Sequence, residues 1–141
     1  MRSNKFLFLD FDGVLHSTSP SIDEFFGKAP LLNDLLAKHP CHVVISSSWR
    51  FNSELDHLKA KLPDPLAKLV VGKTGKPEIG QWPRYSEIKQ YLRMNKPLAE
   101  WRALDDAFLE FPKDCPELIL CHPMQGITKK EITKLTQWLV D

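Results

Sequence analysis

The sequence predicts an α/β protein: a single-domain, Rossmann-like three-layer sandwich with helices on both faces of a mostly parallel, five-stranded sheet. Three observations support this. Short apolar runs rich in aromatic or β-branched residues each stop at a polar residue, and leucine-rich segments with helical spacing lie between them. The length of 141 residues is typical of one domain with a sizeable core, so we take residues 1–141 as a single domain.

Five segments have the composition of buried strands. Residues 5–10 (KFLFLD) and 41–46 (CHVVIS) are continuous apolar runs, as expected of parallel strands covered on both faces. Residues 67–72 (AKLVVG) predict a short third strand. A fourth strand, ending in acidic residues, is expected at 100–107 (EWRALDDA), and a fifth at 117–121 (ELILC).

Helical periodicity occupies the segments between these strands. Residues 29–40 and 53–63 have leucines at helical spacing, and each segment ends at a proline. A loop with several helix-breaking residues, 72–83, precedes a helical stripe in 84–94 (RYSEIKQYLRM). The last segment, 126–141, contains a Thr-x-x-Glu capping-box spacing before its apolar stripe.

The composition excludes several classes of protein. A net charge of +1 with 43% hydrophobic and 26% charged residues is ordinary for a globular protein and indicates no nucleic-acid partner by itself. Four apolar residues before Asp10 are too few for a signal peptide, and no stretch is long enough to span a membrane. Cys41, Cys115 and Cys121 lack C-x-x-C spacing, so we expect reduced thiols, a cytoplasmic protein and no membrane partner.

The polar residues at the strand ends are the main functional signal. Asp10 and Asp12 follow the first strand, and Asp105 and Asp106 follow the fourth. Ligands of open α/β sheets bind beyond the carboxyl ends of the strands. If these two strands are neighbours, the carboxylates crowd together and oppose each other's ionisation, unless a cation such as Mg²⁺ binds them.

The D-x-D-G segment has two other interpretations besides a metal site. It is compatible with a simple polar turn in which Gly13 supplies a positive φ, but the second acidic strand end favours the metal site. A calcium loop of the EF-hand type is excluded, because its glycine would fall on Leu15 and its bidentate glutamate on Ser21.

Three motifs in order resemble those of the haloacid dehalogenase (HAD) superfamily. DFDGVL at 10–15, VVIS at 43–46 and ALDD at 103–106 resemble its first, second and fourth motifs. More narrowly, ISSSWR, LDD and the GIT before the last helix resemble small HAD-like domains associated with RNA-repair proteins. The resemblance extends from Lys5 to the final helix.

The resemblance implies a phosphatase that depends on Mg²⁺. Asp10 would be the nucleophile that forms an aspartyl-phosphate, and Asp12 the general acid and base. Mg²⁺ would be held by Asp10, the backbone carbonyl of Asp12, Asp105 and Asp106. Asp105, the first residue after the apolar run, is the preferred direct ligand, and Asp106 remains the alternative.

A hydroxyl and a glycine complete the implied phosphate site. Ser46 matches the hydroxyl of the second motif, which would donate a hydrogen bond to a phosphoryl oxygen. Ser47 and Ser48 stay open as alternatives, because the end of the strand is predicted only to within about two residues. We include Gly13 and Ser47 with Ser46 among the candidate phosphate-binding residues.

The third HAD motif matches less well. The family usually places a lysine near the start of the helix that precedes the fourth motif, and no lysine fits here. Arg84 is our candidate, because a guanidinium can bind phosphate oxygens in a bidentate manner. Lys73 and Lys76 in the preceding loop are alternatives. Arg84 is also compatible with a purely structural role, as a solvated basic residue at the start of a helix.

Residues beside these motifs are candidates for contact with the substrate. Trp49 and Arg50 follow the serine run and could line the entrance, although a tryptophan after a strand often packs beneath the next helix. His16 follows Asp12 closely enough in sequence to touch the site. We treat the other four histidines as structural, because their spacing is not that of a metal site.

The chain lacks room for an inserted cap domain. Residues 16–31 form a short loop, and 51–83 hold one helix, a strand and a loop. An open site suits a phosphate carried by a large partner, such as a nucleic-acid end or a phosphoprotein, because that partner itself excludes water. Cover from a second subunit or from the 72–83 loop remains an alternative, and the sequence does not predict the oligomeric state.

Two other classes of protein compete with the phosphatase. A receiver domain also forms an aspartyl-phosphate on a parallel sheet, but its acceptor follows a middle strand where this chain has serines. A binding domain that keeps the fold without turnover is the second, because the expected lysine is missing.

Overall fold

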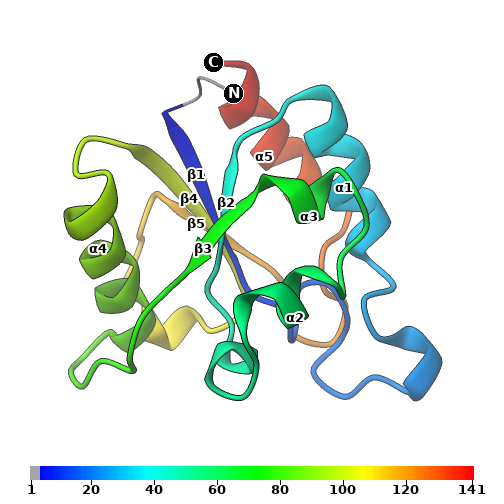
Figure 1. The fold of residues 1–141 in the computed structure, drawn as a ribbon, viewed down its shortest axis with the longest axis horizontal. Coiled ribbons are helices and arrows are strands. Elements are labelled where there is room, and N and C mark those ends of the chain that lie inside the picture. Colours follow the sequence, from blue (N-terminus) through cyan, green and yellow to red (C-terminus); the bar gives the residue numbers. More distant parts are fainter. Residues whose placement is uncertain (1–3) are drawn as a thin grey trace.

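A computed structural model describes residues 4–141, which fold around one sheet of parallel strands in the order β3-β2-β1-β4-β5 (Figure 1). The predicted fold class is confirmed, and the sheet is wholly parallel in this region. The strands are β1 (Lys5–Leu9), β2 (His42–Ile45), β3 (Val70–Lys73), β4 (Glu100–Asp105) and β5 (Leu118–Leu120).

Helices cover both faces of the sheet, unevenly (Figure 1). Helix α4 packs on one face, and α1, α2, α3 and α5 pack on the other. The helices are α1 (Ala29–Lys38), α2 (Leu55–Lys59), α3 (Leu66–Leu69), α4 (Pro83–Asn95) and α5 (Lys129–Val140). Three short 3-10 turns complete the described elements: η1 (Ile22–Glu24), η2 (Ser48–Phe51) and η3 (Phe108–Glu110).

The position of β1 in the middle of the sheet explains its apolar sequence. Along β1, Leu7 and Leu9 point into the core beneath α1 and α5, whereas Phe6 and Phe8 point into the core beneath α4. Because both faces of the strand are buried from Phe6 to Leu9, these positions must be apolar, and the first polar residue after them is Asp10.

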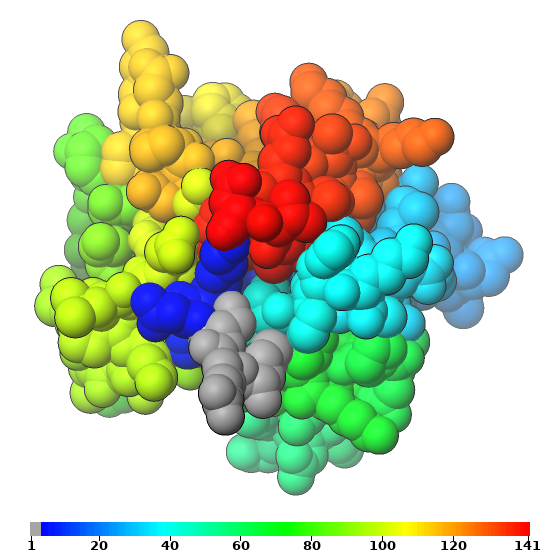
Figure 2. Space-filling view, turned by 90° about the horizontal axis from the view of Figure 1, so that it is seen from above, coloured from blue at the N-terminus to red at the C-terminus, as the bar shows by residue number. Residues whose placement is uncertain are grey.

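The last helix returns to the end of the molecule where the strands begin. Lys5 Nζ at the start of β1 donates a 2.6 Å hydrogen bond to the backbone carbonyl of Trp138 in α5. Figure 2 looks onto this end and shows α5, in red, beside α1, in cyan. The start of α5 matches its predicted capping box, since Glu131 Oε1 accepts a 2.8 Å hydrogen bond from the Thr128 N–H.

The structure corrects the prediction between β2 and β3. The helix expected over 53–63 covers only Leu55–Lys59, and the strand expected over 67–72 is the short helix α3 followed by β3 from Val70. The Asn33 side chain on α1 binds this segment through the Leu66 N–H at 2.9 Å and the Asp64 carbonyl at 3.1 Å. These contacts hold Leu66 in the core and favour a helical turn before the strand.

No cap domain is inserted in the described chain. Between β1 and α1 the structure has only the short turn η1, and between β2 and α4 it has small elements that pack on the sheet. Within residues 4–141, no helix is both long and apolar enough to cross a membrane.

Candidate active site

Four neighbouring strands end in a row of polar residues. Asp10, Ser46 and Thr74 follow β1, β2 and β3, and each donates its backbone N–H to a carbonyl of an adjacent strand at 2.8–3.1 Å. Asp105 is the last residue of β4. The row therefore crosses the sheet at the carboxyl ends of its strands, where open α/β sheets bind their ligands.

The row faces α4. Side chains alternate along a strand, and the residues two positions before Asp10, Ser46 and Asp105 lie in the core beneath that helix: Phe8, Val44 and Ala103. Gly72, two positions before Thr74, lies close to the Tyr91 side chain of α4. The polar side chains of this row are thus directed towards one helix, whose first turn carries Arg84.

Three carboxylates converge at the middle of the row. Asp10, Asp105 and Asp106 each offer an oxygen within 4.8 Å of the others, and Asp10 and Asp105 are 5% and 1% exposed. Burial, reinforced by the Asp105 charge, raises the pKa of Asp10 well above its ordinary range. Burial also raises the pKa values of Asp105 and Asp106. Keeping all three ionised at neutral pH therefore requires additional positive charge.

Arg84 supplies part of that charge. Pro83 occupies the first turn of α4, where its fixed φ favours helix initiation. The next residue places its Nη1 2.6 Å from Asp105 Oδ2 and 3.6 Å from Asp10 Oδ2. Burial alone would lower the pKa of Arg84, but the two carboxylates outweigh burial and raise it. The guanidinium is therefore charged inside the site.

The two alternative lysines lie elsewhere. Lys73 Nζ donates hydrogen bonds to the carbonyls of Arg50 and Ser53, at 3.3 and 3.2 Å. In the sheet register Lys73 pairs with Ile45, whose side chain lies on the face opposite α4. Lys76 is exposed in the following loop. Among the three candidate basic residues, Arg84 is the one that the fold brings to the carboxylates.

The donor set fits Mg²⁺. The converging ligands are carboxylate oxygens, which suit this hard cation. One oxygen of Asp10 accepts the Phe11 N–H at 2.8 Å and one of Asp105 accepts the Ala107 N–H at 2.9 Å, so both carboxylates have fixed orientations. Gly13 has a φ of +77°, and a Cβ there would overlap the Asp106 carboxylate. The glycine allows the acidic loops to approach each other.

Asp12 lies beside the cluster with its side chain 45% exposed. Its Oδ1 is 2.8 Å from His16 Nε2, and its Oδ2 accepts a 3.0 Å hydrogen bond from Trp49 Nε1. Trp49 therefore contacts a site carboxylate directly, and the proximity of His16 in sequence to Asp12 is also contact in space.

The serine run has three different environments. Ser46 lies in the polar row, and its buried hydroxyl has no hydrogen-bond partner among residues 4–141. Ser47 is also buried, but its Oγ accepts the Trp49 N–H at 3.3 Å and thereby caps η2. Ser48 is exposed. Of the three hydroxyls, that of Ser46 is directed towards the α4 side with its donor unused in the described structure.

Sequence reasoning missed Thr74. Its hydroxyl is buried and, like that of Ser46, has no hydrogen-bond partner within the described residues. The signal that could have identified it is its position directly after a strand. The sequence predicts a third strand that ends at Gly72, which places Thr74 in the following loop, whereas β3 ends at Lys73.

Sequence reasoning also missed Glu87. Arg50 is 5% exposed, and its Nη2 lies 2.8 Å from Glu87 Oε1, while its other nitrogens donate to the carbonyls of Gly75 and Ser47, both at 3.0 Å. Glu87 Oε1 is also 3.9 Å from Arg84 Nε. The available signal for Glu87 was its position directly before Ile88, which belongs to the apolar stripe of the helix.

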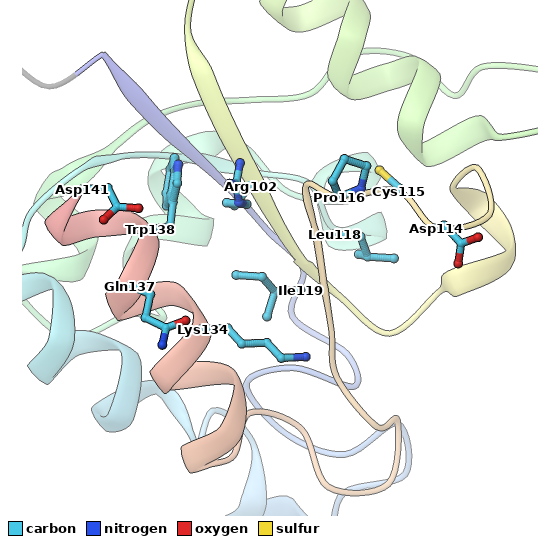
Figure 3. Close-up of a pocket in the computed structure, with 10 residues that line it drawn as sticks. All are labelled: Arg102, Asp114, Cys115, Pro116, Leu118, Ile119, Lys134, Gln137, Trp138 and Asp141. Atoms are coloured by element: carbon cyan, nitrogen blue, oxygen red, sulfur yellow. The ribbon is translucent and has the colours of Figure 1, made fainter.

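A separate groove of about 590 Å³ lies away from this row (Figure 3). It is lined by residues of β4, β5, the loop before β5, α5 and the residue that follows α5. Its charged side chains are mixed, with Arg102 and Lys134 beside Asp114 and Asp141. The groove contains none of the converging carboxylates, so the strand-end row is the candidate active site.

Comparison with known proteins identifies the family. A search of curated proteins finds none that matches the chain. Residues 6–132 match the family described as the HAD domain in Swiss Army Knife RNA repair proteins. This match covers most of the chain, including both acidic strand ends and the first turn of α4. The chain therefore belongs to the HAD domain family of Swiss Army Knife RNA repair proteins.

Proposed function

We propose that this protein is a Mg²⁺-dependent phosphohydrolase that hydrolyses the phosphomonoester at an RNA end through an aspartyl-phosphate intermediate. The observation that carries the proposal is the convergence of Asp10, Asp105 and Asp106 with Arg84 at the carboxyl end of the sheet. A cluster of this charge and burial suits a cation and a phosphate better than a structural role.

Asp10 is the proposed nucleophile. Its Oδ1 accepts the Phe11 N–H, which leaves Oδ2, 3.6 Å from Arg84, to attack phosphorus. The carboxylates of Asp10, Asp105 and Asp106 and the backbone carbonyl of Asp12 would hold Mg²⁺. When bound, the cation would neutralise negative charge on the phosphoryl oxygens.

Asp12 is the proposed general acid and base. As the Asp10–phosphorus bond forms and the ester bond breaks, Asp12 gives its proton to the leaving oxygen. In the second step water attacks phosphorus, the Asp10–phosphorus bond breaks and Asp12 takes the proton from that water. Its half-exposed side chain supports this assignment, because the group must reach a substrate atom outside the buried cluster.

The phosphate contacts follow from the polar row. We propose that the Ser46 hydroxyl and the Arg84 guanidinium donate to the phosphoryl oxygens, and that Gly13 lets the backbone approach them. The unpaired hydroxyl of Ser46 and the charge of Arg84 support these roles. Ser47 and Arg50 have internal partners, so we propose that they shape the site without touching phosphate.

The substrate class rests on two observations. The family description names RNA repair proteins, and the described chain has no cap to enclose a small molecule. An RNA end is large enough to exclude water from an open site by itself. A phosphoprotein would satisfy the second observation but not the first.

Phosphate release from defined substrates tests the proposal. Purified protein with Mg²⁺ is incubated with RNA oligonucleotides phosphorylated at the 3′ or 5′ end, with a phosphopeptide and with p-nitrophenyl phosphate. We expect turnover of an RNA end, lost in Asp10→Asn and on chelation of the cation. No release from any substrate would refute a phosphohydrolase. A stable phospho-protein without turnover would instead indicate a receiver-like domain.

A further inference from the structure

The carboxylate of Asp12 is bound on both of its oxygens by residues from two different loops. His16 Nε2 lies 2.8 Å from Oδ1, and Trp49 Nε1 donates to Oδ2 at 3.0 Å. His16 belongs to the turn after β1, whereas Trp49 is in η2 after β2. Each oxygen therefore receives one ring N–H, which fixes the plane of the carboxylate and leaves further lone pairs for another partner.

The turn itself places the histidine beneath the aspartate. The N–H of Gly13 donates to the carbonyl of His16 at 2.8 Å, which closes the backbone between Asp12 and His16. The His16 side chain is 0% exposed, whereas that of Asp12 is 45% exposed. The histidine thus supports the carboxylate from inside the protein and leaves its outer side open to a substrate.

The neighbouring backbone determines which nitrogen of His16 carries the proton. The N–H of Phe26 donates to His16 Nδ1 at 3.1 Å, so Nδ1 must present a lone pair. The proton then lies on Nε2, and the neutral ring donates it to Asp12. His16 is consequently a directed hydrogen-bond donor in this arrangement.

Aromatic packing keeps both donors in place. The His16 ring lies 5.1 Å from the ring of Phe26 and 5.9 Å from that of Trp49. The Trp49 ring also lies 5.3 Å from Phe26 and 5.7 Å from Phe11. Neither ring can turn away from Asp12 without disturbing these contacts, so the orientation of the carboxylate is built into the fold.

We propose that His16 and Trp49 are positioning residues that hold the Asp12 carboxylate in the orientation needed to transfer a proton to the leaving oxygen and from the attacking water. This inference rests on the proposed function and deepens it, because it assigns the orientation of the acid–base group to two particular donors. General acid–base catalysis depends on placing the proton within hydrogen-bond reach of the reacting atom.

A comparison of leaving groups separates positioning from a merely structural role. An aryl phosphate with a good leaving group, p-nitrophenyl phosphate, needs little help from an acid, whereas an alkyl phosphate needs much. We expect Trp49→Phe and His16→Phe to lower the turnover rate of the alkyl phosphate by a factor on the order of tenfold larger than the factor for p-nitrophenyl phosphate. A misplaced acid loses only part of the rate enhancement that general acid–base catalysis provides. General damage to the fold would lower both rates by the same factor.

Two further variants sharpen this comparison. His16→Gln retains an N–H donor at the position of Nε2, so we expect it to recover part of the lost preference. Phe51→Leu alters an exposed ring in η2, the same turn as Trp49, that lies beside Arg50 and donates nothing to Asp12, so the ratio of the two rates should stay at the wild-type value. A ratio that shifts equally in Phe51→Leu and Trp49→Phe would overturn the proposal.

Nuclear magnetic resonance provides a readout that does not depend on activity. Long-range correlations should show the His16 proton on Nε2, and Asp12→Asn should shift the indole N–H resonance of Trp49, assigned with Trp49→Phe. Protonation of Nδ1 in the neutral ring, or an unmoved indole resonance, would overturn the proposal even in an active enzyme. Wild-type protein that shows these signals but hydrolyses neither phosphate would refute the proposed function, and the catalytic role of the pair with it.

Discussion

Arg84 lies between two buried carboxylates, at 2.6 Å from Asp105 and 3.6 Å from Asp10, and is itself 7% exposed. At this depth a positive charge has to match its partners in shape as well as in sign. Nη1 makes both of these contacts, while Nε lies 3.9 Å from Glu87 Oε1. The planar fork of arginine therefore faces a third carboxylate with a second nitrogen, which the single nitrogen of a lysine ammonium cannot do in the same way.

Arg84→Lys should therefore reduce function while preserving charge. We expect kcat/KM for p-nitrophenyl phosphate to fall on the order of tenfold or more, and Arg84→Ala to be worse, because buried carboxylates would lose their cation. Steady-state kinetics with Mg²⁺ measures the change. Arg93→Lys, an exposed change on the same helix, is the matched control. Equal kinetics for Arg84→Lys and Arg93→Lys would contradict the role of the fork.

Gly13 is a second position at which adding a side chain would disturb the site. Its φ of +77° disfavours any residue with a Cβ, and that Cβ would overlap the Asp106 carboxylate. We expect Gly13→Ala to destabilise the fold by about 1–2 kcal/mol and to weaken Mg²⁺ binding. Urea unfolding and calorimetric titration measure the two effects.

Gly75→Ala is a matched control for this change. Gly75 does not have a positive φ, and a Cβ there would meet no atom within 4 Å. It should leave both stability and Mg²⁺ affinity close to those of the wild type. If Gly13→Ala bound Mg²⁺ as tightly as Gly75→Ala, the close approach of the loop would not matter for the cation.

At the scale of elements, a buried ion pair joins helix α4 to the segments that follow β2 and β3. Arg50 and Glu87 have side chains that are 2% and 6% exposed, and their contact is 2.8 Å. Arg50 also binds the Gly75 carbonyl, and Glu87 accepts the Glu78 N–H at 3.2 Å. The pair therefore fixes the loop after β3 against the helix that carries Arg84.

A double-mutant cycle tests this connection. Arg50→Met or Glu87→Leu alone should cost about 3–5 kcal/mol of unfolding free energy, because each leaves a buried charge without its partner. The double variant should cost clearly less unfolding free energy than the sum of the two single variants, since it removes both charges and leaves no buried charge unpaired. Urea denaturation provides the values. Strict additivity of the two single changes would show that the pair does not couple the loop to α4.

For the whole molecule, the buried carboxylates link stability to pH. Burial raises the pKa of Asp10 and of Asp105 in the folded protein, whereas an aspartate carboxyl group in the unfolded chain has a pKa near 3.8. Between these values the folded protein holds more protons than the unfolded chain. The associated stability is therefore fully present below the unfolded pKa and is lost as the pH rises through the folded pKa.

Mg²⁺ should reverse that loss because it binds the ionised carboxylates. We expect the rise in Tm caused by Mg²⁺ to be larger at about pH 7.5 than at about pH 5, where protons compete with the cation. Thermal unfolding with and without Mg²⁺, with KCl at matched ionic strength as the control, measures the difference. An equal rise at both pH values would contradict binding by these acids.

Outside the segment between β2 and β3, the sequence by itself determined the strands, the helices on both faces and the acidic strand ends. A strand buried on both faces must be apolar at consecutive positions, so β1 and β2 can be recognised from local sequence alone. Asp10 directly follows such a run, and Asp105 follows the buried Ala103 and Leu104 at the end of β4, which is why their convergence could be predicted. The position of Arg84 after a helix-starting proline made it a candidate for the same reason.

Tertiary structure alone decided which of the remaining polar residues meet. Asp12 and Trp49 are 37 positions apart in the chain, as are Arg50 and Glu87, and no local pattern encodes such contacts. The same holds for the helical turn before β3, which depends on the Asn33 side chain of a different helix. Hydrophobic periodicity records whether a residue is buried, but only the packing of distant segments determines what it is buried against.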